Sequence, residues 1–189
     1  VGQSISFNAS TSSDPDGTIV GYLWSFGDGA TSNQAVTTHA YSAAGSYTLT
    51  LTVTDDALPA GSDSTSITVT IDNVAPAMVS HSVSTGNEGE VLSMSVLAQD
   101  PGSDTLVYTW DFGDGSPVVT GASVTHAYAD EGGYSITITV SDGDGGVDSI
   151  STLTTIFNVA PTISSINGDS SGDEGDLLSW AGVVTDPGI

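Results

Sequence analysis

Apolar and polar side chains alternate along most of this chain, and a period of two is the signature of β-strands. The clearest run spans residues 47–54, where aromatic or aliphatic residues at odd positions alternate with threonine at even positions. Residues 134–141 repeat this pattern, with serine or threonine between the apolar residues. Shorter alternating runs occupy 20–26, 106–112 and 67–71. No segment has a helical period of useful length, so the sequence predicts an all-β fold.

The strand pattern belongs to an internal repeat. Trp-Ser-Phe-Gly-Asp-Gly at 24–29 recurs 86 positions later as Trp-Asp-Phe-Gly-Asp-Gly at 110–115. His-Ala-Tyr, Asn-Val-Ala-Pro, Glu-Gly and Asp-Pro recur at nearly the same spacing. This period divides the chain into repeat 1 (1–72, without its first strand), repeat 2 (73–157, complete) and the first two strands of repeat 3 (158–189). The partial repeats lead us to expect a segment of a longer thread, or an assembly in which neighbouring subunits complete them.

Seven or so short strands per repeat, separated by turn residues, fit an immunoglobulin-like β-sandwich. Such folds bury a tryptophan in the third strand and use a tyrosine at the start of the sixth strand to tie a loop to the core. A histidine at equivalent positions of both repeats indicates a structural role. The residues assigned to this framework are Trp24 and Trp110, Tyr47 and Tyr134, and His39 and His126. The sequence therefore predicts tandem immunoglobulin-like sandwiches in a head-to-tail array.

Several of these motifs, taken in order, resemble polycystic-kidney-disease (PKD) domains. The resemblance rests on the Trp-x-Phe-Gly-Asp-Gly hairpin, the His-Ala-Tyr, the Gly-x-Tyr or Gly-Tyr before a threonine-rich strand, and the Asp-rich exit from that strand. It covers essentially the whole chain. It implies a module of secreted or cell-surface proteins that acts as a spacer or adhesive element, often beside the catalytic domains of hydrolases, with no chemistry of its own.

The charge of the chain narrows its partners. It has 23 acidic residues and neither lysine nor arginine, for a formal net charge of −23. Nucleic acid is excluded because phosphate recognition depends on lysine and arginine. Anionic membrane surfaces are excluded for the same reason, and no stretch is apolar and long enough for direct membrane insertion. Divalent cations are the natural partners of such a surface. Cysteine is absent, so no disulfide holds the fold together.

The acidic residues concentrate in loops that an immunoglobulin-like topology places at one end of each sandwich. Calcium takes about six to eight hard oxygen ligands in a loosely specified geometry, which such loops can provide. The candidate ligands are Asp14, Asp16, Asp55 and Asp56 in repeat 1, and Asp100, Asp104, Asp142 and Asp144 in repeat 2, with Asn73 from the linker. The alternative is that these residues are there for turn formation alone.

The two loops differ in their match to relatives of the PKD type, some of which bind calcium through Asp-x-Asp-Gly. Residues 14–17 match that pattern, whereas residues 100–104 carry the second acid two places later. The pattern therefore favours a calcium site in the first loop over one in the second.

No catalytic constellation is found: there is no Gly-x-Ser-x-Gly elbow, phosphate loop or zinc motif. The chain is therefore predicted not to be an enzyme. The first functional hypothesis is an extracellular structural repeat region, such as a stalk, fibre or surface-layer element, stiffened by calcium at the junctions between repeats. Its partners would be neighbouring repeats or subunits. The alternative is an accessory module of a secreted hydrolase or adhesin that binds extracellular polysaccharide or protein.

Overall fold

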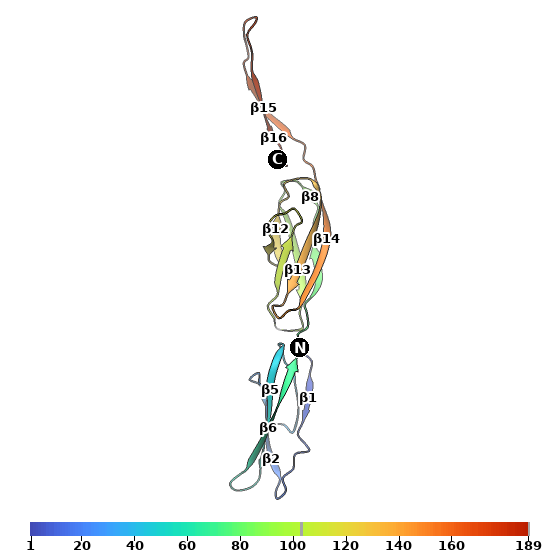
Figure 1. Ribbon diagram of the computed structural model, residues 1–189, viewed down its shortest axis with the longest axis vertical. Coiled ribbons are helices and arrows are strands. Elements are labelled where there is room, and N and C mark those ends of the chain that lie inside the picture. The colour runs from blue at the N-terminus through green and yellow to red at the C-terminus, as the bar shows by residue number, and fades with distance from the viewer. Residues whose placement is uncertain (103, 189) are drawn as a thin grey trace. The chain divides into compact units, whose positions relative to one another are not determined.

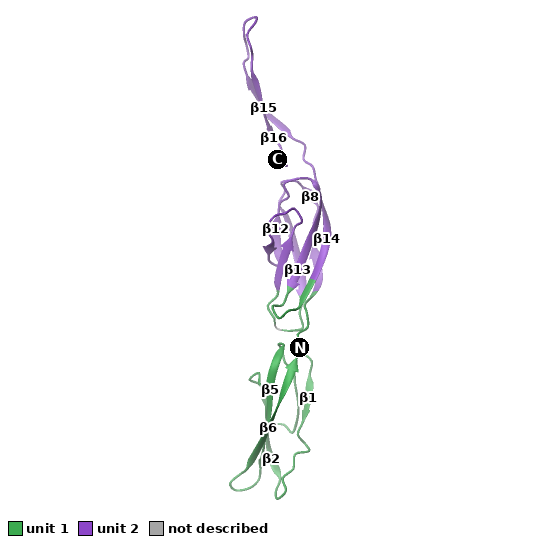
Figure 2. Ribbon diagram, in the orientation of Figure 1, with its two compact units in different colours: residues 1–77, 99–106, 141–148 green, residues 78–98, 107–140, 149–189 purple. Residues whose placement is uncertain are grey.

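A computed structural model describes residues 1–102 and 104–188 of the chain. Ser103, in the expected loop 100–104, and Ile189, at the end of repeat 3, lie outside the described residues. The described part consists of strands and loops, and it contains no helix able to cross a bilayer. Two compact units are distinguished (Figure 2). Unit 1 comprises residues 1–77, 99–106 and 141–148, and unit 2 comprises 78–98, 107–140 and 149–189.

Repeat 1 forms two antiparallel sheets (Figure 1). The smaller sheet pairs β1 with β4, and the larger has the strand order β3-β2-β5-β6. The bounds are β1 Ile5–Asn8, β2 Ile19–Ser25, β3 Thr31–Ser32, β4 Val36–His39, β5 Gly45–Asp55 and β6 Ser62–Ile71.

Repeat 2 has the same plan with one more strand in each sheet. The orders are β12-β9-β7 and β11-β10-β13-β14-β8, and β8 runs parallel to β14. The bounds are β7 Ala77–Ser82, β8 Gly86–Asn87, β9 Leu92–Gln99, β10 Val107–Asp111, β11 Val119–Thr120, β12 Ser123–His126, β13 Gly132–Ser141 and β14 Val147–Phe157. The described part of repeat 3 is one antiparallel pair, β15 (Thr162–Gly168) and β16 (Trp180–Thr185).

The core of repeat 2 lies between its two sheets. The three-stranded sheet contributes Leu92, Met94, Val96 and Val124, and the five-stranded sheet contributes Trp110, Ile136, Ile138 and Ile156. Along β13 the isoleucines are fully buried while the threonines between them are partly exposed, so the period of two in the sequence separates core from surface. The all-β, tandem immunoglobulin-like prediction is confirmed.

Repeat 1 buries fewer residues than its sequence pattern suggests. Val20, at the register shift between Ile19 and Gly21, is 65% exposed, and Ile67, which pairs with the buried Leu49, is 59% exposed. The sheet that covers the inner face of β2, β5 and β6 has only two strands here, against three in repeat 2. Alternation therefore fixes which way a side chain points, while the extent of the opposing sheet decides whether it is buried.

Each Gly-Asp-Gly forms the turn that the sequence predicts. Gly27 and Gly113 have φ values of 86° and 75°, a region in which side chains other than glycine are strained. A Cβ at Gly27 would also lie 2.7 Å from the carbonyl oxygen of Thr48, and one at Gly113 would meet that of Ser135. Glycine is therefore required both by the backbone angle and by the approach of β5 or β13.

Candidate functional site

The linker before repeat 2 lies against an acidic loop of that repeat. Residues 99–106 and 141–148 belong to unit 1 together with the linker. The side-chain amide of Asn73 donates a hydrogen bond to Oδ2 of Asp142 at 2.7 Å, across 69 positions of sequence. Three of the segments expected at this end are thus brought together within one unit.

Asp142 anchors this arrangement. Its Oδ1 accepts hydrogen bonds from the backbone N–H groups of Asp144 (2.8 Å) and Gly146 (2.9 Å), and the residue is 5% exposed. The bond from Asn73 is the main cause that lowers the pKa of Asp142, against the opposing effect of burial. A Cβ at Gly146 would lie 2.7 Å from Cα of Ala75, so glycine lets the linker backbone pack directly against this loop.

Asp104 lies near three other carboxylates of the same group, which repel its negative charge. Burial is the largest cause of its raised pKa, followed by the negative charges of Asp144, Asp100 and Asp142. Asp100 accepts a hydrogen bond on Oδ1 from the backbone of Gly102 at 2.6 Å, which closes the loop. The protein brings like charges together here without any lysine or arginine to compensate them.

Three buried oxygen atoms in this group accept no hydrogen bond from the residues that the structure describes. They are Asn73 Oδ1, Asp100 Oδ2 and Asp104 Oδ2. Buried polar atoms nearly always have a partner, and leaving one without costs about 1–3 kcal/mol. All three are hard oxygen donors of the kind that calcium prefers.

The donor set fits a hard divalent cation, although it is not gathered around one point. Within residues 1–102 and 104–188, no three acidic or histidine side chains converge closely enough to hold an ion as they stand. The loop side chains would have to move to bring the carboxylates together. The residues that could hold the ion are Asn73, Asp100, Asp104 and Asp142, with Asp144 adding charge.

The equivalent loops of repeat 1 are arranged differently. Asp56 accepts hydrogen bonds from the backbone N–H (3.0 Å) and hydroxyl (2.9 Å) of Thr18, and these bonds lower its pKa. Asp55 Oδ1 accepts the backbone N–H groups of Ala57 and Gly61, both at 2.9 Å. These two carboxylates therefore serve local loop structure.

Asp14 and Asp16 lie beside each other in the first loop of repeat 1. The backbone N–H of Asp16 donates to Asp14 at 3.3 Å, which lowers the pKa of Asp14. A hydrogen bond with the Asp16 side chain, burial and the charges of Asp16 and Asp55 outweigh that bond, and the net pKa of Asp14 is raised. Asp14 and Asp55 also line a hollow of about 360 Å³.

The unpaired buried oxygens thus lie at the repeat 2 loops, whereas the Asp-x-Asp-Gly pattern lies in repeat 1. The reason is the linker: Asn73 contributes an amide and a buried carbonyl oxygen to the second site. Unpaired buried oxygens are found in repeat 2 and, within the described residues, not at the repeat 1 loops. A short sequence motif describes a single segment, whereas such a site would be built from several segments of the chain.

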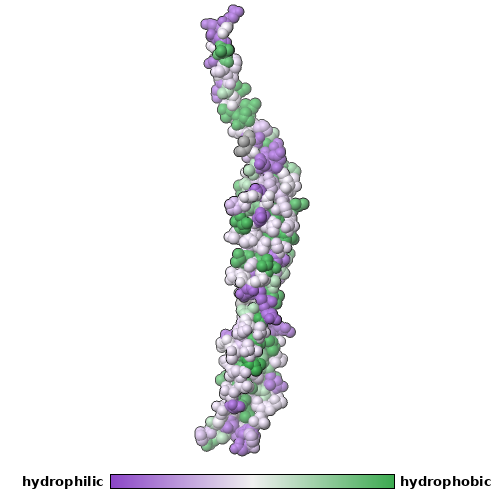
Figure 3. All heavy atoms as spheres, viewed as in Figure 1, coloured by the Kyte–Doolittle hydropathy of each residue, from purple (hydrophilic) through white to green (hydrophobic). Residues whose placement is uncertain are grey.

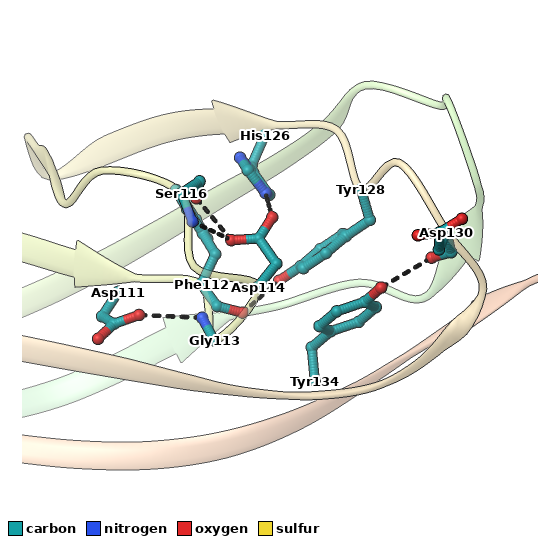
Figure 4. A network of polar contacts seen from close by, with 9 residues as sticks. All are labelled: Asp111, Phe112, Gly113, Asp114, Ser116, His126, Tyr128, Asp130 and Tyr134. Atoms are coloured by element: carbon teal, nitrogen blue, oxygen red, sulfur yellow. Dashed lines mark hydrogen bonds and ion pairs between the residues drawn. The ribbon is translucent and has the colours of Figure 1, made fainter. Parts of the chain in front are cut away.

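A second polar group lies at the Gly-Asp-Gly hairpin (Figure 4). His126 Nε2 lies 2.7 Å from Asp114 Oδ2, and its ring stacks on Phe112 with centroids 3.9 Å apart. Asp114 Oδ1 also accepts the backbone N–H of Ser116 at 3.0 Å. The carboxylate therefore joins the turn to the histidine, a role for Asp114 beyond the turn that sequence reasoning missed.

Repeat 1 has the same histidine–aspartate pair. His39 Nε2 lies 2.7 Å from Asp28 Oδ2, and its ring stacks on Phe26 at 4.1 Å. The signal for this pair was the nearly constant spacing of Asp and His, 11 residues in repeat 1 and 12 in repeat 2. Each histidine packs on a buried phenylalanine and contacts the turn aspartate, which indicates a structural role for both.

The framework aromatic residues occupy the places expected for them. The indole N–H of Trp24 donates to Gln34 O and that of Trp110 to Gly121 O, both at 2.9 Å. The hydroxyls of Tyr47 and Tyr134 each donate to the carbonyl four residues upstream, at 3.0 Å. That bond is the tyrosine corner of immunoglobulin-like folds.

Comparison with known proteins identifies the nature of these repeats. The family profile described as PKD domain matches residues 1–71 and 73–156. A pre-pro-metalloprotease, PrtV, of Vibrio cholerae is 35% identical over 140 residues, which is 74% of this chain and 15% of that protein. A microbial collagenase of Vibrio alginolyticus is 53% identical over 55 residues, 29% of this chain and 7% of the collagenase. The chain thus matches only a small part of each relative.

Solved structures with a similar fold include bacterial and animal proteins. The PKD1 domain of Vibrio anguillarum Epp has 24% identity and a TM-score of 0.39, and covers 45% of this chain and 96% of its own. The amphioxus IgVJ-C2 molecule has 17% identity and a TM-score of 0.49, and covers 80% of this chain and 96% of its own.

Proposed function

The chain belongs to the PKD domain family, and on this premise we propose that it is an extracellular spacer stiffened by calcium at the junction before repeat 2. PKD domains are non-catalytic modules, so the chain itself is not an enzyme. Its relatives include a pre-pro-metalloprotease and collagenases. We infer that this chain is likewise a non-catalytic region of an exported hydrolase or surface protein.

The observation that carries the calcium proposal is the group of buried, unpaired oxygens beside the linker. Asn73 belongs to the linker, while Asp100 and Asp104 belong to the first acidic loop of repeat 2. Calcium supplies a positive charge that these oxygens and their neighbouring carboxylates otherwise lack. Holding linker and loop on one ion would restrict the bending of the chain at this point.

The stability of the chain should then depend on calcium. Binding to the folded state alone stabilises by about 2.7 kcal/mol when free calcium is a hundredfold above the dissociation constant. We expect the melting temperature in calorimetry to rise with the logarithm of calcium concentration and to fall on chelation. Sodium chloride at matched ionic strength controls for screening.

Asp104→Asn gives the sharper test because its two effects have opposite signs. Without calcium, removal of one of several mutually repelling charges should raise the melting temperature. With calcium, loss of a ligand should weaken binding, measured by titration calorimetry, by on the order of tenfold or more. Asp130→Asn, outside the acidic loops, is the matched control. Absence of binding heat together with an unchanged melting point would rule out the calcium role.

A second candidate function is binding to an extracellular protein. Collagenases of Vibrio alginolyticus, Bacillus cereus and Clostridium perfringens contain segments similar to this chain. Figure 3 shows a largely pale surface with small separate apolar patches, in keeping with strand faces rich in serine and threonine. Retention on insoluble collagen, compared with chitin and cellulose, would test this function. Equal retention on all three, or on none, would leave the spacer role.

A further inference from the structure

The linker after repeat 2 is held by a different residue from the linker before it. Glu88 follows β8 and is 3% exposed, which is unusual for a carboxylate. Its Oε1 accepts the backbone N–H of Val159 in the outgoing linker at 2.8 Å. Its Oε2 accepts the backbone N–H of Glu131, in the loop before β13, at 3.1 Å. One buried side chain thus ties the linker to the body of repeat 2.

Glu88 and Gly89 also contact the first loop of repeat 3. A Cβ at Gly188 would lie 2.6 Å from Oε2 of Glu88, so this glycine lets the loop approach the carboxylate. Gly89 has a φ of 73°, and its backbone N–H donates to Tyr128 O at 2.8 Å. A Cβ at Gly89 would lie 2.9 Å from Cβ of Pro187. The recurring Glu-Gly and Asp-Pro pairs therefore meet in space within unit 2.

Unit 1 contains a partly equivalent contact. Gly2 has a φ of 69°, and its backbone N–H donates to Tyr41 O at 2.7 Å, as Gly89 does to Tyr128. The Cβ position of Gly2 lies 3.5 Å from Pro101 O, in the first loop of repeat 2. Val1 occupies the position of Glu88, so the first junction lacks the carboxylate.

We infer that Glu88 and Gly89 form a docking surface for the following repeat, and that the Glu88 carboxylate locks the outgoing linker without any metal ion. Hydrogen bonds to a charged acceptor are about twice as strong as neutral ones. Here one such bond joins Glu88 to the backbone of the next linker at Val159, and the other joins it to Glu131 within repeat 2. The first junction has the amide–carboxylate pair of Asn73 and Asp142, and the second has the carboxylate–backbone lock of Glu88.

Amide hydrogen exchange, followed by NMR on the 189-residue chain in the presence of chelator, tests the lock. Glu88→Ala should speed exchange at Val159 and Glu131 by about tenfold or more and leave the amides of β10 unchanged. Glu88→Gln keeps one acceptor oxygen and should affect one of the two amides more than the other. Glu90→Gln, which replaces an exposed carboxylate two positions away, is the matched control.

These variants separate the possible outcomes. If Glu88→Ala disrupts repeat 2 as a whole, the uneven effect of Glu88→Gln still tests the two bonds. Unchanged exchange at Val159 in both Glu88 variants, or an equal change in Glu90→Gln, would overturn the proposal. Chelator keeps the test independent of the calcium site, so that either proposal can fail without the other.

A distance measurement tests the consequence for the junction. The chain has no cysteine, so cysteines introduced at the exposed positions Thr125 and Ser170 would carry the only two spin labels. Pulsed EPR should give a narrow distance distribution for the parent chain and one about twofold broader after Glu88→Ala. An equally narrow distribution in both would show that Glu88 does not fix the junction.

Discussion

Asp114 does two things at once in the third-strand hairpin of repeat 2. One carboxylate oxygen caps the turn by accepting the N–H of Ser116, and the other binds His126. The ring of His126 stacks on Phe112. It also makes an edge-to-face contact with Tyr128, and the centroids of these two rings are 4.6 Å apart. Tyr128 in turn donates its hydroxyl to Phe112 O, and burial raises its pKa. The hairpin is thus fixed by one connected polar and aromatic group.

Removal of the charge at Asp114 should weaken this group. In Asp114→Asn the atom that faces His126 is either a neutral amide oxygen or an NH2 group, which cannot accept a hydrogen bond. We therefore expect a loss of about 1–2 kcal/mol in the free energy of unfolding. Asp111→Asn is the matched control, because an asparagine can still accept the N–H of Gly113 at that turn. Urea denaturation at neutral pH gives both values. A similar change in the two variants would contradict the role of the histidine pair.

The pH dependence of stability should follow the same carboxylates. Burial opposes the shift, but hydrogen bonds from Ser116 and His126 prevail and lower the pKa of Asp114, and Ala30 and His39 have the same effect on Asp28. A group whose pKa is lower in the folded state stabilises the fold above its unfolded pKa, about 3.9 for aspartate. That contribution is lost as the pH falls through the folded value.

Urea midpoints measured without calcium between neutral pH and about pH 3 should therefore fall at the acid end. Among the described carboxyls with a clear shift, those with a lowered pKa outnumber those with a raised one. The lowered group comprises Asp28, Asp56, Asp114 and Asp142, and the raised group Asp14 and Asp104. Asp114→Asn should make the fall of the urea midpoint toward acid pH smaller. A midpoint that rises toward acid would show that repulsion at Asp14 and Asp104 dominates instead.

At the scale of elements, strand β13 shows how pattern becomes packing. Ile136, Ile138 and Val140 are fully buried, while Thr137 and Thr139 on the other face hydrogen-bond to serines of β14. The outward hydroxyls are paired across strands and so need no charged neighbours. This arrangement lets a chain with no lysine or arginine present long strands to solvent.

The hairpin glycine should be far less replaceable than a glycine in an open position. Gly113→Ala introduces a Cβ at positive φ, against the backbone of Ser135, and should cost about 1–3 kcal/mol. Gly133→Ala is the matched control, because nothing lies within 4 Å of its Cβ position. Thermal denaturation of both variants measures the difference. Equal melting points would mean that the β13 backbone shifts to accept the side chain.

The acidic junction is where sequence reasoning was least complete. The candidate residues of repeat 2 could be named from loop positions, because an immunoglobulin-like topology fixes which loops share an end. The unpaired oxygen of Asn73 and the role of Glu88 could not, since burial of a single atom depends on how the linker packs. The preference for the first loop over the second, which comes from the Asp-x-Asp-Gly pattern, stays a prediction.

For the whole molecule, the formal charge of −23 is the dominant electrostatic fact. Every carboxylate repels the others, and no lysine or arginine offsets them. Self-repulsion of this kind destabilises a folded state, while it keeps the protein soluble and discourages anionic partners. Screening by salt should therefore stabilise the fold.

We expect the melting temperature to rise by a few degrees when sodium chloride is raised from about 10 mM to about 500 mM, because the Debye length falls severalfold. Choline chloride in place of sodium chloride should have the same effect, since screening does not depend on the cation. Calcium should exceed both at equal ionic strength if it binds at the repeat 2 site. A melting temperature that falls with salt would mean that attractive pairs outweigh the net repulsion.

The sequence by itself determined the fold class, the repeat and the alternation of inward and outward side chains along strands such as β13. Each of these depends on local periodicity or on counting, which a linear chain records completely. Only the tertiary structure decided which acidic loop has unpaired oxygens, that histidine and aspartate meet at each hairpin, and that Glu88 holds the outgoing linker. Those are contacts between segments that are far apart in the sequence. Their geometry depends on how closely the backbones of these segments pack in the folded protein.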